Sequence, residues 1–206
     1  MNNQALVATR RALHGVAELV IAGPQYAASG TIRLRVVPGG FAGTTSAMRV
    51  DGADLVWDGG RIPLSGSCRR MADAVGVTAV VPDIYGDGSG VDPDEELTFD
   101  PQALALLLTW LERGHAALRA FAPDADPVLW PEHLDVGYAL GEVNYGVSPG
   151  DDSHEAPYAY VGPWEPREGA FWNAPFGATR DAEALADRDA VVAFFDEGRR
   201  AAAGTG

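Results

Sequence analysis

The chain has 206 residues, 47% of them hydrophobic and 21% charged, and these values suit a globular domain and exclude a disordered chain. Its formal net charge of −14 makes nucleic acid and anionic membranes poor partners, so we expect neither. All 15 basic residues are arginine, and without lysine the chain cannot form a Schiff base or a P-loop nucleotide site.

The cysteine content and the N-terminal segment bear on the cellular compartment. Cys68 is the single cysteine, which excludes a disulfide within the chain. The N-terminal segment has the apolar content of an export signal, but arginines interrupt it and no small-residue cleavage site follows. No apolar run is long enough to span a membrane. These features predict a cytoplasmic protein.

The first part of the chain is predicted to form a helix followed by short strands. The helix is expected from about Gln4 to Ile21, where Gly23-Pro24 should end it. Alternating apolar residues and turn-forming pairs such as Asp51-Gly52 then predict a meander of strands at 31–37, 48–50, 55–57 and 61–64.

A short helix over 67–75 and a strand over 77–81 are predicted next. Cys68 lies at the start of this helix. A helix N-terminus and two following arginines could lower the pKa of its thiol. The alternative is an inert, partly buried residue, and we favour that interpretation.

Two long helices complete the predicted fold. Asp100 and Pro101 are typical of a helix start, and apolar residues at helical spacing extend this helix to about Phe121. The last helix is expected from about Asp181 to Ala202. We therefore predict a single α+β domain over residues 1–206, in which a mainly antiparallel sheet is covered by three main helices at 4–21, 101–121 and 181–202.

The stretch from Trp130 to Asn173 is the predicted site, because it holds 8 of the 18 aromatic residues together with many acids. A strand is predicted over 134–140, with one face formed by Leu134, Val136, Tyr138 and Leu140 and the other by His133, Asp135, Gly137, Ala139 and Gly141. The small residues of the second face leave room for a helix or a ligand. A second predicted strand places Tyr158 and Tyr160 on one face. A turn-rich loop between the strands carries Asp151, Asp152, His154 and Glu155.

We favour a small-molecule-binding protein or an enzyme whose pocket is lined by residues 130–173. The candidate catalytic residues are His133, Asp135 and His154, acting either around a metal ion or in metal-free acid–base chemistry. The candidate ligand-binding residues are Asn144, Tyr145, Tyr158, Tyr160, Trp164, Trp172 and Asn173. The alternative is a non-enzymatic protein whose aromatic segment forms the interface of a homodimer. The sequence identifies no particular metal or cofactor.

Part of this stretch also carries a resemblance to other proteins. The matching residues are Trp130, Leu134, Asp135, Tyr158, Ala159 and Tyr160. Mainly over residues 128–200, the chain resembles an uncharacterised family of high-GC bacterial proteins, a domain of unknown function. The resemblance implies a similar fold and supplies no activity or catalytic residue.

Overall fold

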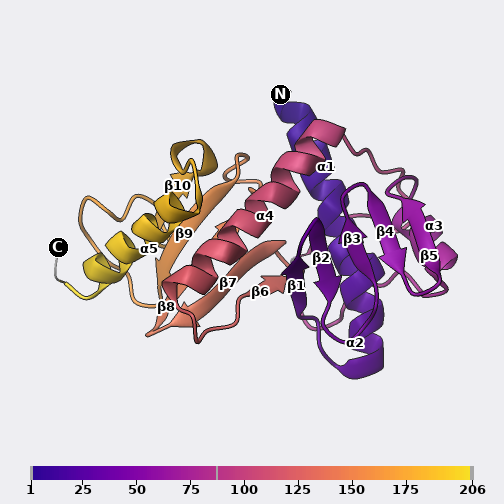
Figure 1. The fold of residues 1–206 in the computed structure, drawn as a ribbon, viewed down its shortest axis with the longest axis horizontal. Coiled ribbons are helices and arrows are strands. Elements are labelled where there is room, and N and C mark those ends of the chain that lie inside the picture. Colours follow the sequence, from indigo (N-terminus) through magenta and orange to yellow (C-terminus); the bar gives the residue numbers. More distant parts are fainter. Residues whose placement is uncertain (1, 87, 205–206) are drawn as a thin grey trace. The chain divides into compact units, whose positions relative to one another are not determined.

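The computed structural model describes residues 2–86 and 88–204, and the chain divides into two compact units (Figure 1). Unit 1 consists of Met1–Thr109 and Leu129–Leu134, and unit 2 of Trp110–Val128 and Asp135–Gly206. Both units contain helices and antiparallel strands, so the predicted α+β class is confirmed. The extent of the domain, 1–206, stays a prediction.

Unit 1 begins with a long helical segment and continues as a meander. Its helices are α1 (Asn3–Gly15), the π-helix η1 (Val16–Ala22), α2 (Gly23–Ser29) and α3 (Cys68–Val75). Its strands pair antiparallel in the order β6 (Val128–Trp130), β1 (Leu34–Val37), β2 (Gly40–Gly43), β3 (Arg49–Asp51), β4 (Asp54–Trp57) and β5 (Gly60–Pro63). The predicted meander is thus confirmed, with β2 as an additional strand.

The first helical segment does not end at Gly23-Pro24, and that prediction was wrong. The segment continues through η1 into α2 and ends at Gly30, which has a left-handed φ of 72°. Pro24 lies in the first turn of α2, where its missing N–H needs no partner. A π-helix, with its wider turn, precedes that proline, and the chain therefore remains helical across it.

The strand predicted at 77–81 is also absent from the described structure. Instead of pairing with another strand, the Val80 N–H donates to the Leu19 carbonyl of η1 at 3.1 Å. A Cβ at Gly23 would lie 1.8 Å from the Val80 carbonyl oxygen, so glycine permits this close approach. The segment therefore packs against the helix and not within the sheet.

Unit 2 is built on antiparallel strands with helices against one face. The strands pair in the order β7 (Asp135–Leu140), β8 (Val143–Ser148), β9 (Tyr158–Pro163) and β10 (Ala178–Asp181). A 3₁₀ turn, η2 (Ala182–Ala184), leads to α5 (Arg188–Ala202). The last helix therefore begins later than predicted, because residues 178–181 join the sheet.

The helix α4 (Pro101–Phe121) has the predicted bounds and runs from unit 1 into unit 2. Asp100 caps its start, because the Asp100 Oδ1 accepts from the N–H groups of Gln102 and Ala103 at 3.0 and 2.9 Å. In unit 2, a Cβ at Gly114 would lie 2.0 Å from the side chain of Val147. Glycine therefore lets α4 approach β8 closely.

The core of unit 2 lies between its strands and the helices α4 and α5. Tyr138 donates from its hydroxyl to the Leu118 carbonyl of α4 at 3.0 Å. Gly198 of α5 contacts Val161 of β9. Phe121, Tyr145 and Phe195 form an aromatic cluster, with ring centroids 4.8 to 5.9 Å apart. This face of the strands is consequently filled by packed side chains.

Cys68 is fully buried in unit 1, and burial raises the pKa of its thiol to about 12, with the carboxylates of Glu18 and Glu95 acting in the same direction. We expect iodoacetamide at pH 8 to alkylate Cys68 in the native protein at least about 100-fold more slowly than in the urea-unfolded chain, because the thiolate is the nucleophile. Mass spectrometry of timed samples measures both rates. Similar rates would show that the thiol is accessible.

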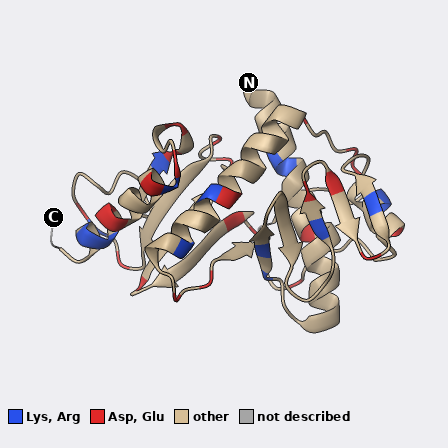
Figure 2. Cartoon of the chain, in the orientation of Figure 1, with Lys and Arg blue, Asp and Glu red and all other residues tan. Residues whose placement is uncertain are grey.

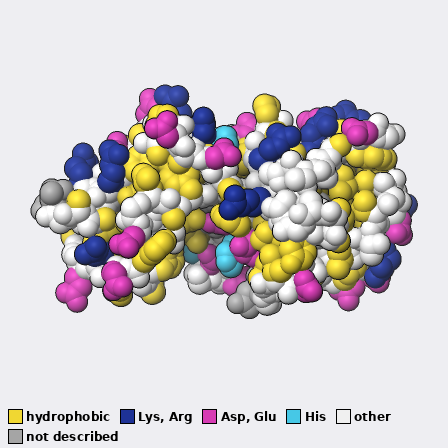
Figure 3. All heavy atoms as spheres, turned by 90° about the horizontal axis from the view of Figure 1, so that it is seen from below, with side chains coloured by type: hydrophobic (Ala, Val, Ile, Leu, Met, Phe, Trp, Pro, Cys, Tyr) yellow, Lys and Arg dark blue, Asp and Glu magenta, His cyan; other side chains and the backbone are white. Residues whose placement is uncertain are grey.

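Charged groups are distributed over both units. Acidic and basic side chains occur together along α5 and among the strands of unit 1 (Figure 2). The face drawn in Figure 3 likewise carries both signs interspersed. Among the helices of the described residues, none combines the length and the apolar character needed to cross a membrane. The cytoplasmic location stays a prediction.

Candidate functional site

The strands of unit 2 have a second face, opposite the one on which α4 and α5 pack. Residues paired across neighbouring strands share a face, and residues two apart along a strand do so as well. By this register, the second face carries Asp135 and Gly137 of β7, Asn144, Gly146 and Ser148 of β8, Tyr158 and Tyr160 of β9, and Thr179 and Asp181 of β10. We call it the polar face.

The glycines of the polar face accommodate a tyrosine ring. A Cβ at Gly146 would lie 2.3 Å from the Tyr160 hydroxyl oxygen, and a Cβ at Gly137 would lie 2.7 Å from it. The Tyr160 hydroxyl donates a hydrogen bond to Asp135 Oδ2. The small residues in β7 and β8 therefore make room for Tyr160, and neither a helix of unit 2 nor a ligand is needed to explain them.

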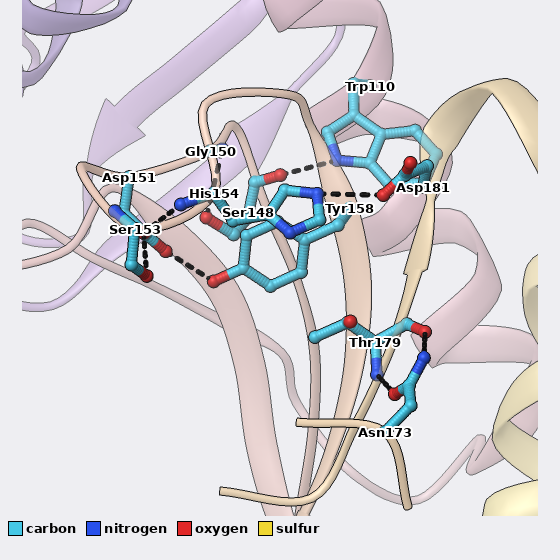
Figure 4. Close-up of polar contacts among 10 residues, drawn as sticks. All are labelled: Trp110, Ser148, Gly150, Asp151, Ser153, His154, Tyr158, Asn173, Thr179 and Asp181. Carbon is cyan, nitrogen blue, oxygen red and sulfur yellow. Dashed lines mark hydrogen bonds and ion pairs between the residues drawn. The ribbon is translucent and has the colours of Figure 1, made fainter. Parts of the chain in front are cut away.

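Hydrogen bonds and a ring contact hold the loop between β8 and β9 against the polar face (Figure 4). Asp151 Oδ1 accepts from the backbone N–H groups of Ser153 and His154, and its Oδ2 accepts from the Tyr158 hydroxyl at 2.6 Å. The His154 ring lies against the Tyr158 ring, with centroids 4.6 Å apart. His154 Nε2 is 2.8 Å from Asp181 Oδ1 at the end of β10.

Burial and hydrogen bonding determine which of these groups carry protons. Burial raises the pKa of Tyr158 and of Tyr160, and the neighbouring carboxylates act in the same direction, so both phenols stay protonated donors. Burial disfavours the charged form of Asp151, but hydrogen bonds from Ser153 and Tyr158 outweigh it and lower the pKa of that carboxyl. Asp151 is therefore a carboxylate that organises the loop.

The His154–Asp181 pair could also take part in proton transfer. Because Asp181 accepts from Nε2, the other ring nitrogen, Nδ1, is the acceptor of the neutral ring. Figure 4 shows no hydrogen bond from Nδ1 to the residues drawn. A third of the His154 side chain is exposed, so the ring reaches solvent. Its catalytic role stays a prediction.

The structure does not place the three candidate catalytic residues on one strand face. His133 lies in the turn 131–134 of unit 1, is exposed, and precedes β7. Leu134, the next residue, has a left-handed φ of 54°, which interrupts the extended conformation. The prediction that His133 continues the face of Asp135 was therefore wrong. Gly141, at the other end, lies in the turn after β7 with a φ of 58°.

The candidate ligand-binding residues fall into several environments. Tyr158 and Tyr160 share the polar face as predicted, with ring centroids 6.4 Å apart. Asn144 is exposed on this face, and its Oδ1 accepts from the Trp164 indole N–H at 3.4 Å. Asn173 instead bonds the backbone N–H and carbonyl of Thr179, so its amide has a structural role.

The aromatic residues of the segment after β9 differ in exposure. Trp172 is half-buried against Phe171, with ring centroids 4.9 Å apart. Trp164 is 62% exposed and Phe176 is 49% exposed. Exposed aromatic side chains of this kind suit an interface, and the homodimer stays a prediction.

Tyr145 belongs to neither the loop nor the polar face. Its ring is 2% exposed and packs with Phe121 and Phe195 on the helical side of β8. The turn-rich loop predicted over 144–157 was wrong for its first five residues, because residues 143–148 form β8, while residues 149–157 do form the loop before β9. Within the described residues, the Tyr145 hydroxyl makes no hydrogen bond. It lines a pocket instead.

This pocket has a volume of about 280 Å³ and is formed entirely by residues of unit 2. It lies where the β7–β8 turn and the end of β9 meet the last turn of α5. Its apolar wall includes Leu140, Val143 and Pro163, and its polar groups are Glu142, Tyr145, Glu165, Arg167 and Arg199. Most of these residues fall within the predicted segment 130–173.

The charged side chains that line the pocket differ in whether they form ion pairs or hydrogen bonds. Arg199 pairs with Asp196 at 2.5 Å and lies over the Phe121 ring. The side chains of Arg167, Glu142 and Glu165 form no hydrogen bond or ion pair with the part of the chain that the structure describes. None of the three is among the named candidate residues, although all of them lie in the predicted segment 130–173. The one local signal for them is the pair Gly141-Glu142, because a glycine at the end of a strand favours a turn.

Glu142 occupies an unusual backbone conformation. Together with Gly141 it forms the two-residue turn between β7 and β8, and both residues have positive φ, 58° for Gly141 and 62° for Glu142. Such turns favour asparagine or glycine at both positions, and a glutamate there costs on the order of 1 kcal/mol. The strained residue is therefore one of those that line the pocket.

Metal binding finds no support in the described part of the chain. Over residues 2–86 and 88–204, no group of three or more His, Cys, Asp or Glu side chains is placed to hold a metal ion.

Comparisons of the chain with protein-family models, with curated proteins and with solved structures give no match. The resemblance inferred over residues 128–200 stays a prediction.

Proposed function

We propose that this protein binds a small zwitterion with an apolar body, of the size of an α-amino acid, in the pocket of unit 2. The observation that carries the proposal is that one pocket is lined by a Tyr145 hydroxyl and by charges of both signs that have no hydrogen-bond or ion-pair partner among the described residues. Pockets for drug-sized ligands measure about 300–1,000 Å³. The volume here, about 280 Å³, suits a smaller ligand.

The polar groups suit the two ends of such a molecule. A guanidinium offers parallel donors that match a carboxylate, and among the described residues Arg167 has no partner that would compete. The Tyr145 hydroxyl is a further donor, because burial raises its pKa and keeps it protonated. Glu142 and Glu165 supply acceptors for an ammonium group. Leu140, Val143 and Pro163 offer apolar contact to the rest of the ligand.

The ligand class is testable with three probes of one shape, titrated calorimetrically: L-phenylalanine, 3-phenylpropionate and phenethylammonium. We expect L-phenylalanine to bind most tightly. Arg167→Gln should weaken the binding of L-phenylalanine and 3-phenylpropionate about two- to fivefold, as an exposed charge contact is worth up to about 1 kcal/mol. The same change should leave phenethylammonium unaffected, because that probe has no carboxylate.

Two further variants complete the experiment. Glu142→Asn keeps a residue that tolerates the left-handed conformation, so it should weaken only the two probes that carry an ammonium group. Arg188→Gln is the matched control, since Arg188 is exposed at the other end of α5 and pairs with Asp189. The proposal fails if no probe binds below 10 mM, or if Arg167→Gln and Arg188→Gln have equal effects.

A further inference from the structure

Strand β10 is the outer strand of unit 2, and the chain segment that precedes it covers its free edge. Among the described residues β10 pairs only with β9, so the backbone groups on its other side need a different partner. The N–H and C=O groups of an antiparallel strand point alternately to one side and to the other. Those of Thr179 point away from β9, because both of them bond the Asn173 side chain.

The Asn173 side chain takes the place of a neighbouring strand at Thr179 (Figure 4). Its Oδ1 accepts from the Thr179 N–H at 2.8 Å, and its Nδ2 donates to the Thr179 carbonyl at 3.1 Å. Two residues that face each other in a hydrogen-bonded antiparallel pair exchange the same two bonds. A carboxamide can reproduce them because it holds a donor and an acceptor in one planar group. Asn173 therefore occupies both outward-facing backbone groups of Thr179.

A short hairpin satisfies the residue before the strand in a similar way. The Ala174 N–H donates to the Gly177 carbonyl, and the Gly177 N–H donates to the Ala174 carbonyl, both at 3.0 Å. Gly177 has a φ of 147°, and a Cβ there would lie 2.1 Å from the Val161 carbonyl oxygen, so glycine lets the chain turn into β10. Residues 173–176, which we call the edge cover, thus make four hydrogen bonds with Gly177 and Thr179.

The edge cover is a thin, exposed segment that is separate from the pocket of unit 2. Asn173, Pro175 and Phe176 are exposed, so solvent lies on its outer side. None of its residues lines the pocket. The role of the edge cover is consequently independent of the proposed ligand.

We propose that the edge cover prevents β10 from pairing with the same strand of a second copy of the chain, and that Asn173 fixes the cover at Thr179. An uncovered edge strand presents unpaired N–H and C=O groups and is a template for pairing with another chain. The β10 edge is self-complementary, because two antiparallel strands related by a two-fold axis exchange identical bonds. The bonds of Asn173 are exposed to water, so we expect their loss to change association more than folding.

The association test uses sedimentation velocity of the full-length protein from 10 to 500 µM. Asn173→Ala removes two of the four hydrogen bonds, and adding Ala174→Pro removes a third, because proline has no N–H. We expect the double variant to have an association constant at least about tenfold above that of the unmodified protein, and Asn173→Ala to change it in the same direction. Adding Thr179→Pro should reverse the effect, since it removes an outward N–H that a second copy would bond and leaves the pairing with β9 intact.

Hydrogen exchange of the Thr179 amide tests the role of Asn173 independently of association. In Asn173→Ala this amide should exchange at least about tenfold faster, because its acceptor is gone. Asn144→Ala is the matched control, since Asn144 is an exposed asparagine of the same unit whose side chain bonds the Trp164 indole. It should leave both the exchange rate and the association constant unchanged.

Four results would overturn the proposal. They are a folded double variant that associates no more than the unmodified protein, association that Thr179→Pro does not reverse, an unchanged exchange rate of Thr179 in Asn173→Ala, and dissociation of the unmodified protein by Thr179→Pro alone. The last result would mean that the edge is already paired with another chain. Circular dichroism establishes that each variant folds. If the double variant does not fold, Asn173→Ala and the exchange rate still decide.

Discussion

Gly146→Ala should lower the free energy of unfolding by about 2–3 kcal/mol, the range for forced overpacking of a well-packed site. The new methyl carbon would lie 2.3 Å from the Tyr160 hydroxyl oxygen and 2.4 Å from Cζ of the ring. Tyr160 cannot easily move away, because its hydroxyl is bonded to Asp135. Strand β8 is paired on both sides, so its backbone cannot retreat either. Urea denaturation followed by tryptophan fluorescence measures the loss.

A matched glycine and a second-site change test the cause. At Gly86, a Cβ would meet nothing within 4 Å, so Gly86→Ala should alter the free energy of unfolding by less than about 0.5 kcal/mol. In a Tyr160→Ala background the obstacle is gone, and Gly146→Ala should then cost less than about 1 kcal/mol. A cost that is the same with and without the Tyr160 ring would refute the packing of that ring on Gly146.

Phe195→Ala should lower the free energy of unfolding by about 3–5 kcal/mol, the typical cost of removing a buried aromatic ring. Phe195 is fully buried on α5, and its ring centroid lies 5.6 Å from that of Phe121 and 5.9 Å from that of Tyr145. Removal of the ring leaves a cavity at the junction of α4, α5 and β8. Denaturation curves with unchanged m-values would establish that the loss is one of stability.

Phe176→Ala is the control, because it makes the same chemical change at a side chain that is 49% exposed. We expect it to lower the free energy of unfolding by less than about 1 kcal/mol. Comparable losses for the two variants would mean that Phe176 is buried in solution, for example in the predicted homodimer. Analytical ultracentrifugation of the unmodified protein distinguishes that explanation from an error in the position of α5.

Local patterns in the sequence predicted much of the fold. Helix α4 has the predicted bounds, since Asp100 caps it and its apolar residues recur at helical spacing. The strands β3, β4 and β5 were found because alternating residues are separated by short glycine-containing turns. Tyr158 and Tyr160 were placed on one face correctly, because strand periodicity alone determines that relationship.

The missed elements depend on contacts between distant residues. Strand β8 contains Asn144, Gly146 and Ser148, which locally favour a turn, yet Gly146 is needed because the Tyr160 ring lies over it. The same strand places Tyr145 among Phe121 and Phe195, where the sequence suggested a loop residue. Propensity is a weak prior when packing and strand pairing on both sides act together.

The sequence pattern indicates where the candidate site lies, whereas the tertiary structure determines which residues come together in it. By itself, the sequence determined the α+β class, the long helix α4, and the aromatic and acidic stretch that lines most of the pocket. Only the tertiary structure decided that Glu142 and Arg167 line one pocket and that His154 lies beside Asp181. The periodicity of apolar residues indicates the face of a helix or strand on which a residue lies. Contacts between residues far apart in the sequence depend instead on how distant segments pack, and no local pattern encodes that packing.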